Sequence, residues 1–129
     1  MFDSSLAQEG YQSAVSSTGS DRQTEFRIFA RATQDLSTPD RDAPDYPSKI
    51  ANALNNNLKL WTYVAIDVAD EKNPLPQELK ANLFYLSEFT RQHTAKVHAG
   101  SASPQVLIDI NKSVMRGLRG QTDSQKGDL

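Results

Sequence analysis

Apolar residues recur three and four positions apart along most of this chain, the spacing that places side chains on one face of a helix. The spacing predicts helices over residues 21–36, from about residue 48 to a stop at 73–76, from residue 76 to about 99, and from residue 104 to about 117. A shorter helix or a frayed turn is expected before residue 15. No stretch shows the alternation of a half-buried strand. We therefore predict an all-α fold, a small bundle of four to five helices.

A corner at Asn73-Pro74-Leu75-Pro76 separates the two longest apolar stretches. Pro74 disfavours the helical region for Asn73, and neither proline can donate a backbone hydrogen bond. Pro76 suits the first turn of a new helix, where its missing N–H would have no partner in any case. The corner therefore predicts a helical hairpin on which the rest of the chain packs. A second proline-rich segment, residues 37–48, is expected to be a long surface loop.

The helix before this corner is apolar over most of its circumference and holds the only tryptophan, Trp61. Such a helix is usually central, with neighbours on more than one face. Asn55, Asn56 and Asn57 interrupt its apolar pattern with three poor helix formers. They are interpreted as a solvated face or, alternatively, as a polar patch that hydrogen-bonds to a partner.

Composition limits the organisation of the chain and its classes of partner. Its 129 residues suit one domain, predicted over residues 1–120, and the polar residues 121–129 are predicted to be a disordered tail. The net charge of −2 argues against a general nucleic-acid binder, which needs clustered Lys and Arg. Without cysteine there is no thiolate nucleophile or thiolate metal site. No apolar run is long enough to insert in a membrane, so a cytoplasmic protein is expected.

No group of residues points to catalysis. His93 and His98 lie five positions apart, so they do not converge as two zinc ligands on a helix would, and His93 is expected to be a hydrogen-bonded core residue. The sequence has no glycine-rich phosphate loop and no nucleophile elbow. Asp67, Asp70 and Glu71 lie unfavourably for the dipole of their helix, so they are candidates for contact with basic groups, or are simply solvated. We expect no enzyme activity, no cofactor and no metal.

A series of short motifs resembles the flagellar biosynthesis regulators of the FlaF family. In chain order the motifs are Tyr11-Gln12-Ser13-Ala14, Asn52-Ala53-Leu54-Asn55-Asn56-Asn57, Leu60-Trp61-Thr62, Asn73-Pro74-Leu75-Pro76, Leu107-Ile108-Asp109-Ile110-Asn111 and Gly117-Leu118-Arg119-Gly120. They cover roughly residues 11–120. Residues 1–10 and the proline-rich insert around residues 39–47 depart from a minimal member of the family.

The resemblance implies a non-enzymatic role in assembly of the bacterial flagellum in alphaproteobacteria. Proteins of this family support flagellin synthesis and protein secretion together with the regulator FlbT, and some bind flagellin as an export chaperone. Flagellin and FlbT are therefore the expected partners. The alternative is an adaptor of FlbT that acts on flagellin mRNA translation without binding flagellin. Direct RNA binding is a third possibility, against which the acidic balance and the lack of a basic stripe count.

An apolar groove between helices would suit a helical flagellin segment. The residues proposed to line it are Leu60, Trp61, Tyr63, Val64 and Tyr85. The competing interpretation is that the apolar side chains on both sides of the helix before the corner are buried within the bundle. For Trp61, this interpretation is favoured. Tyr63 and Tyr85 are better candidates for exposure, since tyrosine is a common anchor of interfaces.

Overall fold

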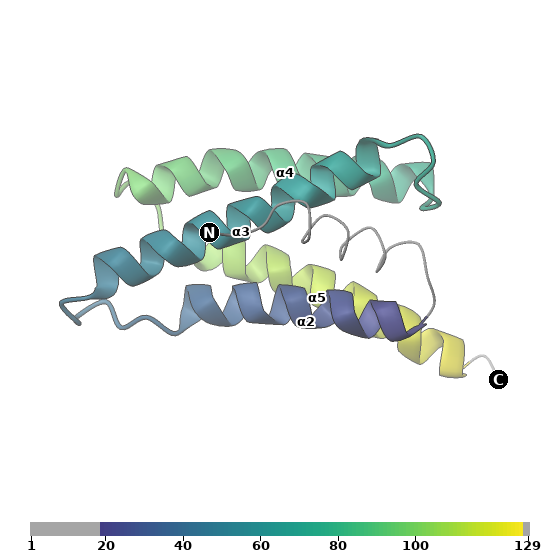
Figure 1. The fold of residues 1–129 in the computed structure, drawn as a ribbon, viewed down its shortest axis with the longest axis horizontal. Coiled ribbons are helices and arrows are strands. Elements are labelled where there is room, and N and C mark those ends of the chain that lie inside the picture. Colours follow the sequence, from purple (N-terminus) through teal and green to yellow (C-terminus); the bar gives the residue numbers. More distant parts are fainter. Residues whose placement is uncertain (1–18, 128–129) are drawn as a thin grey trace.

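The computed structural model describes the backbone of residues 19–127 and the side chains of residues 23–118. Over this range the chain forms four α-helices and no strand, which confirms the all-α prediction (Figure 1). The helices are α2 (Gly19–Ser37), α3 (Tyr46–Ala69), α4 (Gln77–His98) and α5 (Gln105–Gly127). The helix or turn expected before residue 15 lies outside the described residues.

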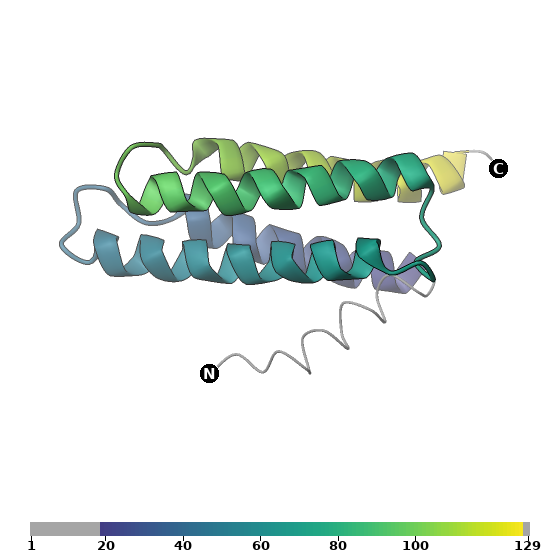
Figure 2. The same cartoon turned by 90° about the horizontal axis from the view of Figure 1, so that it is seen from above.

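The four helices run lengthwise beside one another, with their connections at the two ends of the bundle (Figures 1 and 2). Helix α3 packs chiefly against α4, and α2 packs chiefly against α5. Contact between α2 and α3 is less extensive, and contact between α4 and α5 is the sparsest of the four. The predicted hairpin around residues 73–76 is therefore one of two closely packed helix pairs.

Two helix boundaries differ from the sequence prediction. Helix α3 begins at Tyr46 rather than near residue 48, with Pro47 in its first turn, where a missing backbone donor is harmless. Helix α5 continues to Gly127, whereas the prediction ends it between Gly117 and Gly120. An isolated glycine lowers helix propensity by only about 1 kcal/mol, so it does not by itself end a helix. The division into a domain over residues 1–120 and a disordered tail stays a prediction.

The buried apolar side chains come from three of the four helices. One cluster joins α2 and α3 around Phe29, Trp61 and Val64, and a second joins α2, α3 and α5 around Leu54 and Leu107. Helix α4 contributes no fully buried apolar side chain among the described residues. Its buried residues are the small polar ones Ser87, Thr90 and Thr94. Its larger apolar residues, such as Leu83 and Leu86, are only partly buried and pack at the edge of the core.

A chain of buried polar side chains links α3 to α5. Trp61 Nε1 donates to Asn111 Oδ1 at 2.9 Å, and Asn111 Nδ2 donates to Asn57 Oδ1 at 2.8 Å. Trp61 is 1% exposed and both asparagines are fully buried. Asn55 and Asn56 are exposed, as a solvated face requires, but Asn57 is an internal hydrogen-bonding residue that neither sequence interpretation anticipated.

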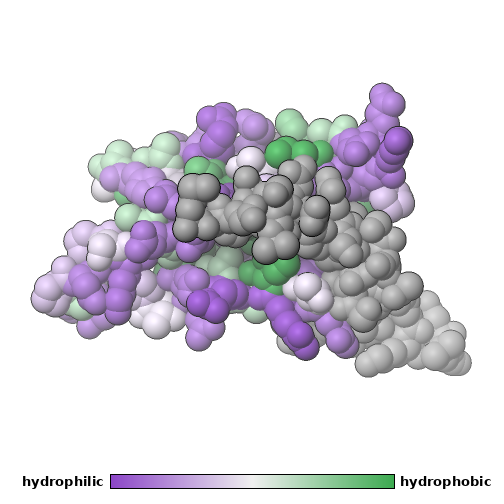
Figure 3. Space-filling view, viewed as in Figure 1, coloured by the Kyte–Doolittle hydropathy of each residue, from purple (hydrophilic) through white to green (hydrophobic). Residues whose placement is uncertain are grey.

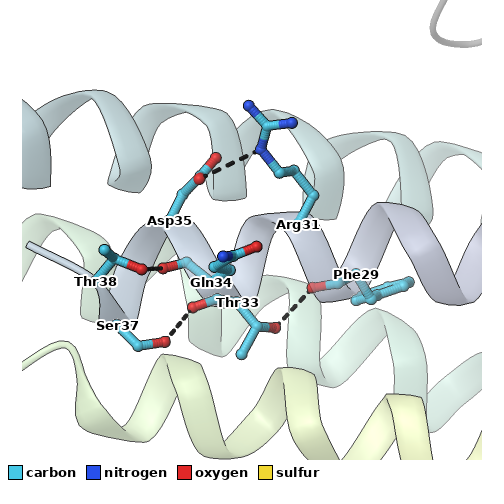
Figure 4. Close-up of polar contacts among 7 residues, drawn as sticks. All are labelled: Phe29, Arg31, Thr33, Gln34, Asp35, Ser37 and Thr38. Atoms are coloured by element: carbon cyan, nitrogen blue, oxygen red, sulfur yellow. Dashed lines mark hydrogen bonds and ion pairs between the residues drawn. The ribbon is translucent and has the colours of Figure 1, made fainter.

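The last turns of α2 are held by side chains that bond back to the helix (Figure 4). The hydroxyl of Thr33 donates to the carbonyl of Phe29 at 2.7 Å, and that of Thr38 donates to the carbonyl of Gln34 at 2.7 Å. The hydroxyl of Ser37 bonds to the carbonyl of Thr33. Each hydroxyl bonds to the carbonyl four residues earlier, and the carbonyl of Gln34 also accepts the backbone N–H of Thr38 at 2.9 Å, so these side chains add second donors to carbonyls of the helix end.

Candidate functional site

The corner between α3 and α4 is fixed by one asparagine. Asn73 is 8% exposed, and its Nδ2 donates to the backbone carbonyl of Asp67 at 3.1 Å and to Asp67 Oδ2 at 3.0 Å. Its Oδ1 accepts the backbone N–H of Leu75 at 2.9 Å. The side chain thus holds together the end of α3 and the segment leading into α4, so the neighbouring surface has a defined shape.

Three carboxylates gather at the C-terminal end of α3: Asp67, Asp70 and Glu71. None of them belongs to an ion pair among the described residues. Partial burial, with the nearby charge of Asp70 as a second cause, raises the pKa of Asp67 above its ordinary value, although the hydrogen bond from Asn73 opposes the rise. The negative end of the helix dipole lies here as well. This end of the hairpin therefore carries uncompensated negative charge.

The large apolar residues that are exposed among the described side chains all lie on the α3–α4 hairpin. They are Ile66 on α3, 49% exposed, and Phe84 and Tyr85 on α4, 45% and 66% exposed. Figure 3 shows apolar surface over this hairpin, bordered by hydrophilic surface. Single exposed apolar residues are common on monomers, but their restriction to one hairpin marks a candidate interaction surface.

An open pocket of about 450 Å³ lies between the end of α3 and the first turns of α4. It is lined by Val68, Ala69, Glu71, Gln77, Lys80, Ala81 and Phe84. The apolar side chains come from both helices, and the exposed ring of Phe84 is the largest of them. Lys80 Nζ donates to the backbone carbonyl of Asn73 at 3.4 Å, so this ammonium is directed at the corner. The pocket thus combines an apolar surface with the carboxylate of Glu71.

The structure separates the five residues proposed from the sequence as a groove. Leu60, Trp61 and Val64 are 8%, 1% and 0% exposed and lie in the core, as the competing interpretation of α3 holds. Tyr63 is half-buried and packs against the same cluster. Tyr85 is 66% exposed on α4. The five side chains do not line one surface, and whether any of them contacts a partner stays a prediction.

Sequence reasoning missed Ile66 and Phe84 as exposed residues. Ile66 belongs to the excess apolar surface of α3, but so do Leu60 and Val64, which are buried, so its position in the sequence does not single it out. Phe84 gave only a weak signal, since it stands beside an apolar stripe and directly before Tyr85. Only the position of α4 against α3 leaves both side chains outside the core.

His93 is half-buried between α4 and the connection to α5 rather than in the core. Its Nε2 donates to the backbone carbonyl of Ser103 at 2.8 Å, and its ring stacks on Phe89 at a centroid distance of 5.6 Å. Within the described part of the chain, no three His, Asp or Glu residues are grouped so that they could hold a metal ion. None of the described helices is long and apolar enough to cross a membrane.

The family model of the flagellar protein FlaF matches residues 7–118, which is most of the chain. The chain belongs to the FlaF family. The match includes all of α2, α3 and α4 and the first part of α5, and therefore the whole hairpin with its pocket. Comparison with curated proteins and with solved structures returned no match. The FlaF-family assignment makes this a flagellar protein.

Proposed function

We propose that this FlaF-family chain binds flagellin in the cytoplasm as an export chaperone. In this role it supports flagellin synthesis and secretion together with FlbT. It acts by binding rather than by catalysis, without a cofactor. The family membership supports a flagellar role, and the features of the α3–α4 hairpin support a binding role.

The observation that carries this proposal is the location of Ile66, Phe84 and Tyr85 on one hairpin beside an open pocket. A chaperone for a polymerising subunit needs an accessible apolar surface that can shield the subunit until export. Interfaces between proteins are enriched in aromatic anchors at their centre, and the hairpin offers two adjacent aromatic residues. An amphipathic helix can lie along such a surface, as in other helix-in-groove complexes.

Co-expression with flagellin tests the proposal. The full chain, carrying an affinity tag, is purified together with untagged flagellin, and the product is run on a sizing column. A co-eluting complex of defined stoichiometry is the expected result. The double variant Phe84→Ser, Tyr85→Ser should reduce the complex while keeping the helical circular dichroism spectrum, because both side chains are already exposed.

A folded chain that elutes separately from flagellin would refute the chaperone role. That result would favour the adaptor of FlbT, and the same column run with FlbT in place of flagellin would then test this alternative. A complex that forms equally well with the double variant would leave flagellin binding intact and exclude the hairpin as its site.

A further inference from the structure

The pocket between α3 and α4 has charged residues at its rim. Its wall includes Glu71 and Lys80, and the neighbouring corner carries further acidic groups. The ionisable groups of the corner and the first turn of α4 are Asp67, Asp70, Glu71, Lys72, Glu78 and Lys80. Carboxylates outnumber ammonium groups four to two in this set. The pocket therefore presents an apolar surface beside a corner with an excess of carboxylates.

Neither lysine forms an ion pair with Glu71, although Lys80 lines the same pocket. No ion pair within 4.0 Å joins Glu71 to a basic group among the described residues. Lys80 is directed at the carbonyl of Asn73, and Lys72 follows Glu71 in the turn. Three other carboxylates, Asp35, Asp45 and Glu88, are paired with basic residues on their own helix or at its cap. Glu71 is thus available to a positive group from outside.

From this arrangement we propose that the pocket binds a basic amphipathic helix of flagellin. An apolar side chain of that helix packs on Phe84 and Ala81, while a Lys or Arg about one turn away pairs with Glu71. This inference rests on the proposed function and specifies its binding site. Charge complementarity selects the occupant, because an acidic segment would meet the carboxylates of Asp67, Asp70 and Glu71 together.

The test measures flagellin binding by the full chain carrying Glu71→Lys. Its matched control is Asp42→Lys, which makes the same change of charge at an exposed position in the loop between α2 and α3. That loop lies at the opposite end of the bundle from the corner (Figure 1). Affinity is measured by titration at low and at moderate salt, and thermal unfolding confirms that each variant is folded. The variant Phe84→Ser, at a residue that is 45% exposed, tests the apolar part separately.

We expect Glu71→Lys to weaken binding by about tenfold or more, since it replaces an attraction with a repulsion, and to flatten the salt dependence. Asp42→Lys should change the affinity by less than about twofold, because surface charges separated by more than a Debye length are screened. Phe84→Ser should weaken binding at both salt concentrations.

Two failures are distinguishable. If the unaltered chain binds flagellin and the two charge variants behave alike, the site inferred here is wrong while the chaperone role stands. If the unaltered chain does not bind flagellin, the proposed function is refuted and this inference with it.

Discussion

Substitution of Asn111 by alanine should be among the most destabilising single changes in the bundle. The side chain is fully buried and makes two hydrogen bonds, one to Trp61 Nε1 at 2.9 Å and one to Asn57 Oδ1 at 2.8 Å. In Asn111→Ala the indole N–H and the Asn57 carbonyl oxygen lose their partners in a place that water does not reach. An unpaired buried polar group costs about 1–3 kcal/mol, so two of them predict a loss of about 3 kcal/mol or more.

Urea unfolding followed by far-ultraviolet circular dichroism measures this loss. The midpoint should fall without a change in the slope of free energy against denaturant, since the surface exposed on unfolding is nearly the same. Lys112→Ala is the control, because it truncates the next residue of α5 on its exposed side. The control should change the free energy of unfolding by less than about 0.5 kcal/mol.

A double-mutant cycle separates the hydrogen bond from simple loss of packing. Trp61→Phe removes the indole donor, so in the Asn111→Ala background it also removes the orphaned N–H. The double variant should therefore be about 1–2 kcal/mol more stable than the sum of the single effects predicts. If the two effects add to within about 0.5 kcal/mol, or if Asn111→Ala costs no more than Lys112→Ala, the buried hydrogen-bond chain does not stabilise this fold.

Three further predictions concern stability. Thr90 Oγ1 is buried without a partner, whereas Thr94 Oγ1 donates to the carbonyl of Thr90 at 2.6 Å. Thr90→Val should therefore raise the free energy of unfolding by about 1 kcal/mol, and Thr94→Val should lower it. Equal effects of the two substitutions in urea unfolding would contradict this prediction. Gly117 lies within α5 with open space where a Cβ would be, while Gly100 has a φ of 79°. In thermal unfolding, Gly117→Ala should stabilise the chain by about 0.5–1 kcal/mol and Gly100→Ala should destabilise it by about 1 kcal/mol. If Gly100→Ala is the more stable of the two variants, this account of the two glycines is wrong. The pKa of Asp67 is raised in the folded state, so the folded chain binds more protons and its stability falls as pH rises from the ordinary value of 3.8 through the raised pKa. Asp67→Asn should therefore have a higher free energy of unfolding than the unaltered chain at pH 7. This difference should shrink as pH falls from the raised pKa of Asp67 towards 3.8. A difference that does not depend on pH would exclude the titration of Asp67 as its cause.

The helices of this fold follow from the sequence because their signals are local. The apolar spacing around Phe29 and Leu36 marks α2, and the prolines at residues 74 and 76 mark the corner, since both act through neighbouring residues of the chain. The role of Asn57 could not be found in this way. Its partner Asn111 lies 54 positions away, and an asparagine in a helix has the same local signal whether it is solvated or buried. Only the packing of α3 against α5 decides between the two.

The candidate site shows the same division between local and long-range information. Helical spacing shows that α3 has more apolar surface than one stripe needs, so the spacing suits Trp61 and Val64 both to a groove and to the core. Which side chains remain outside depends on the neighbouring helices. The buried residues of α4 are Ser87, Thr90 and Thr94, whereas its larger apolar residues are partly or fully exposed. The sequence could predict an excess of apolar surface, but not its place.

The side chains that α4 buries against the other helices, and those that it leaves exposed, bear on whether its outer surface binds a partner. Core burial in the described structure comes from α2, α3 and α5, so an outward apolar residue on α4 such as Phe84 is not needed to complete the core. Selection for stability alone would favour a polar residue at a position that is 45% exposed. An aromatic side chain there, beside a pocket and an unpaired carboxylate, instead suits a helix whose outer surface binds a partner. The fold thus separates two features: α2, α3 and α5 provide the buried apolar side chains, and the hairpin formed by α3 and α4 carries the exposed residues Ile66, Phe84 and Tyr85, where we propose that flagellin binds.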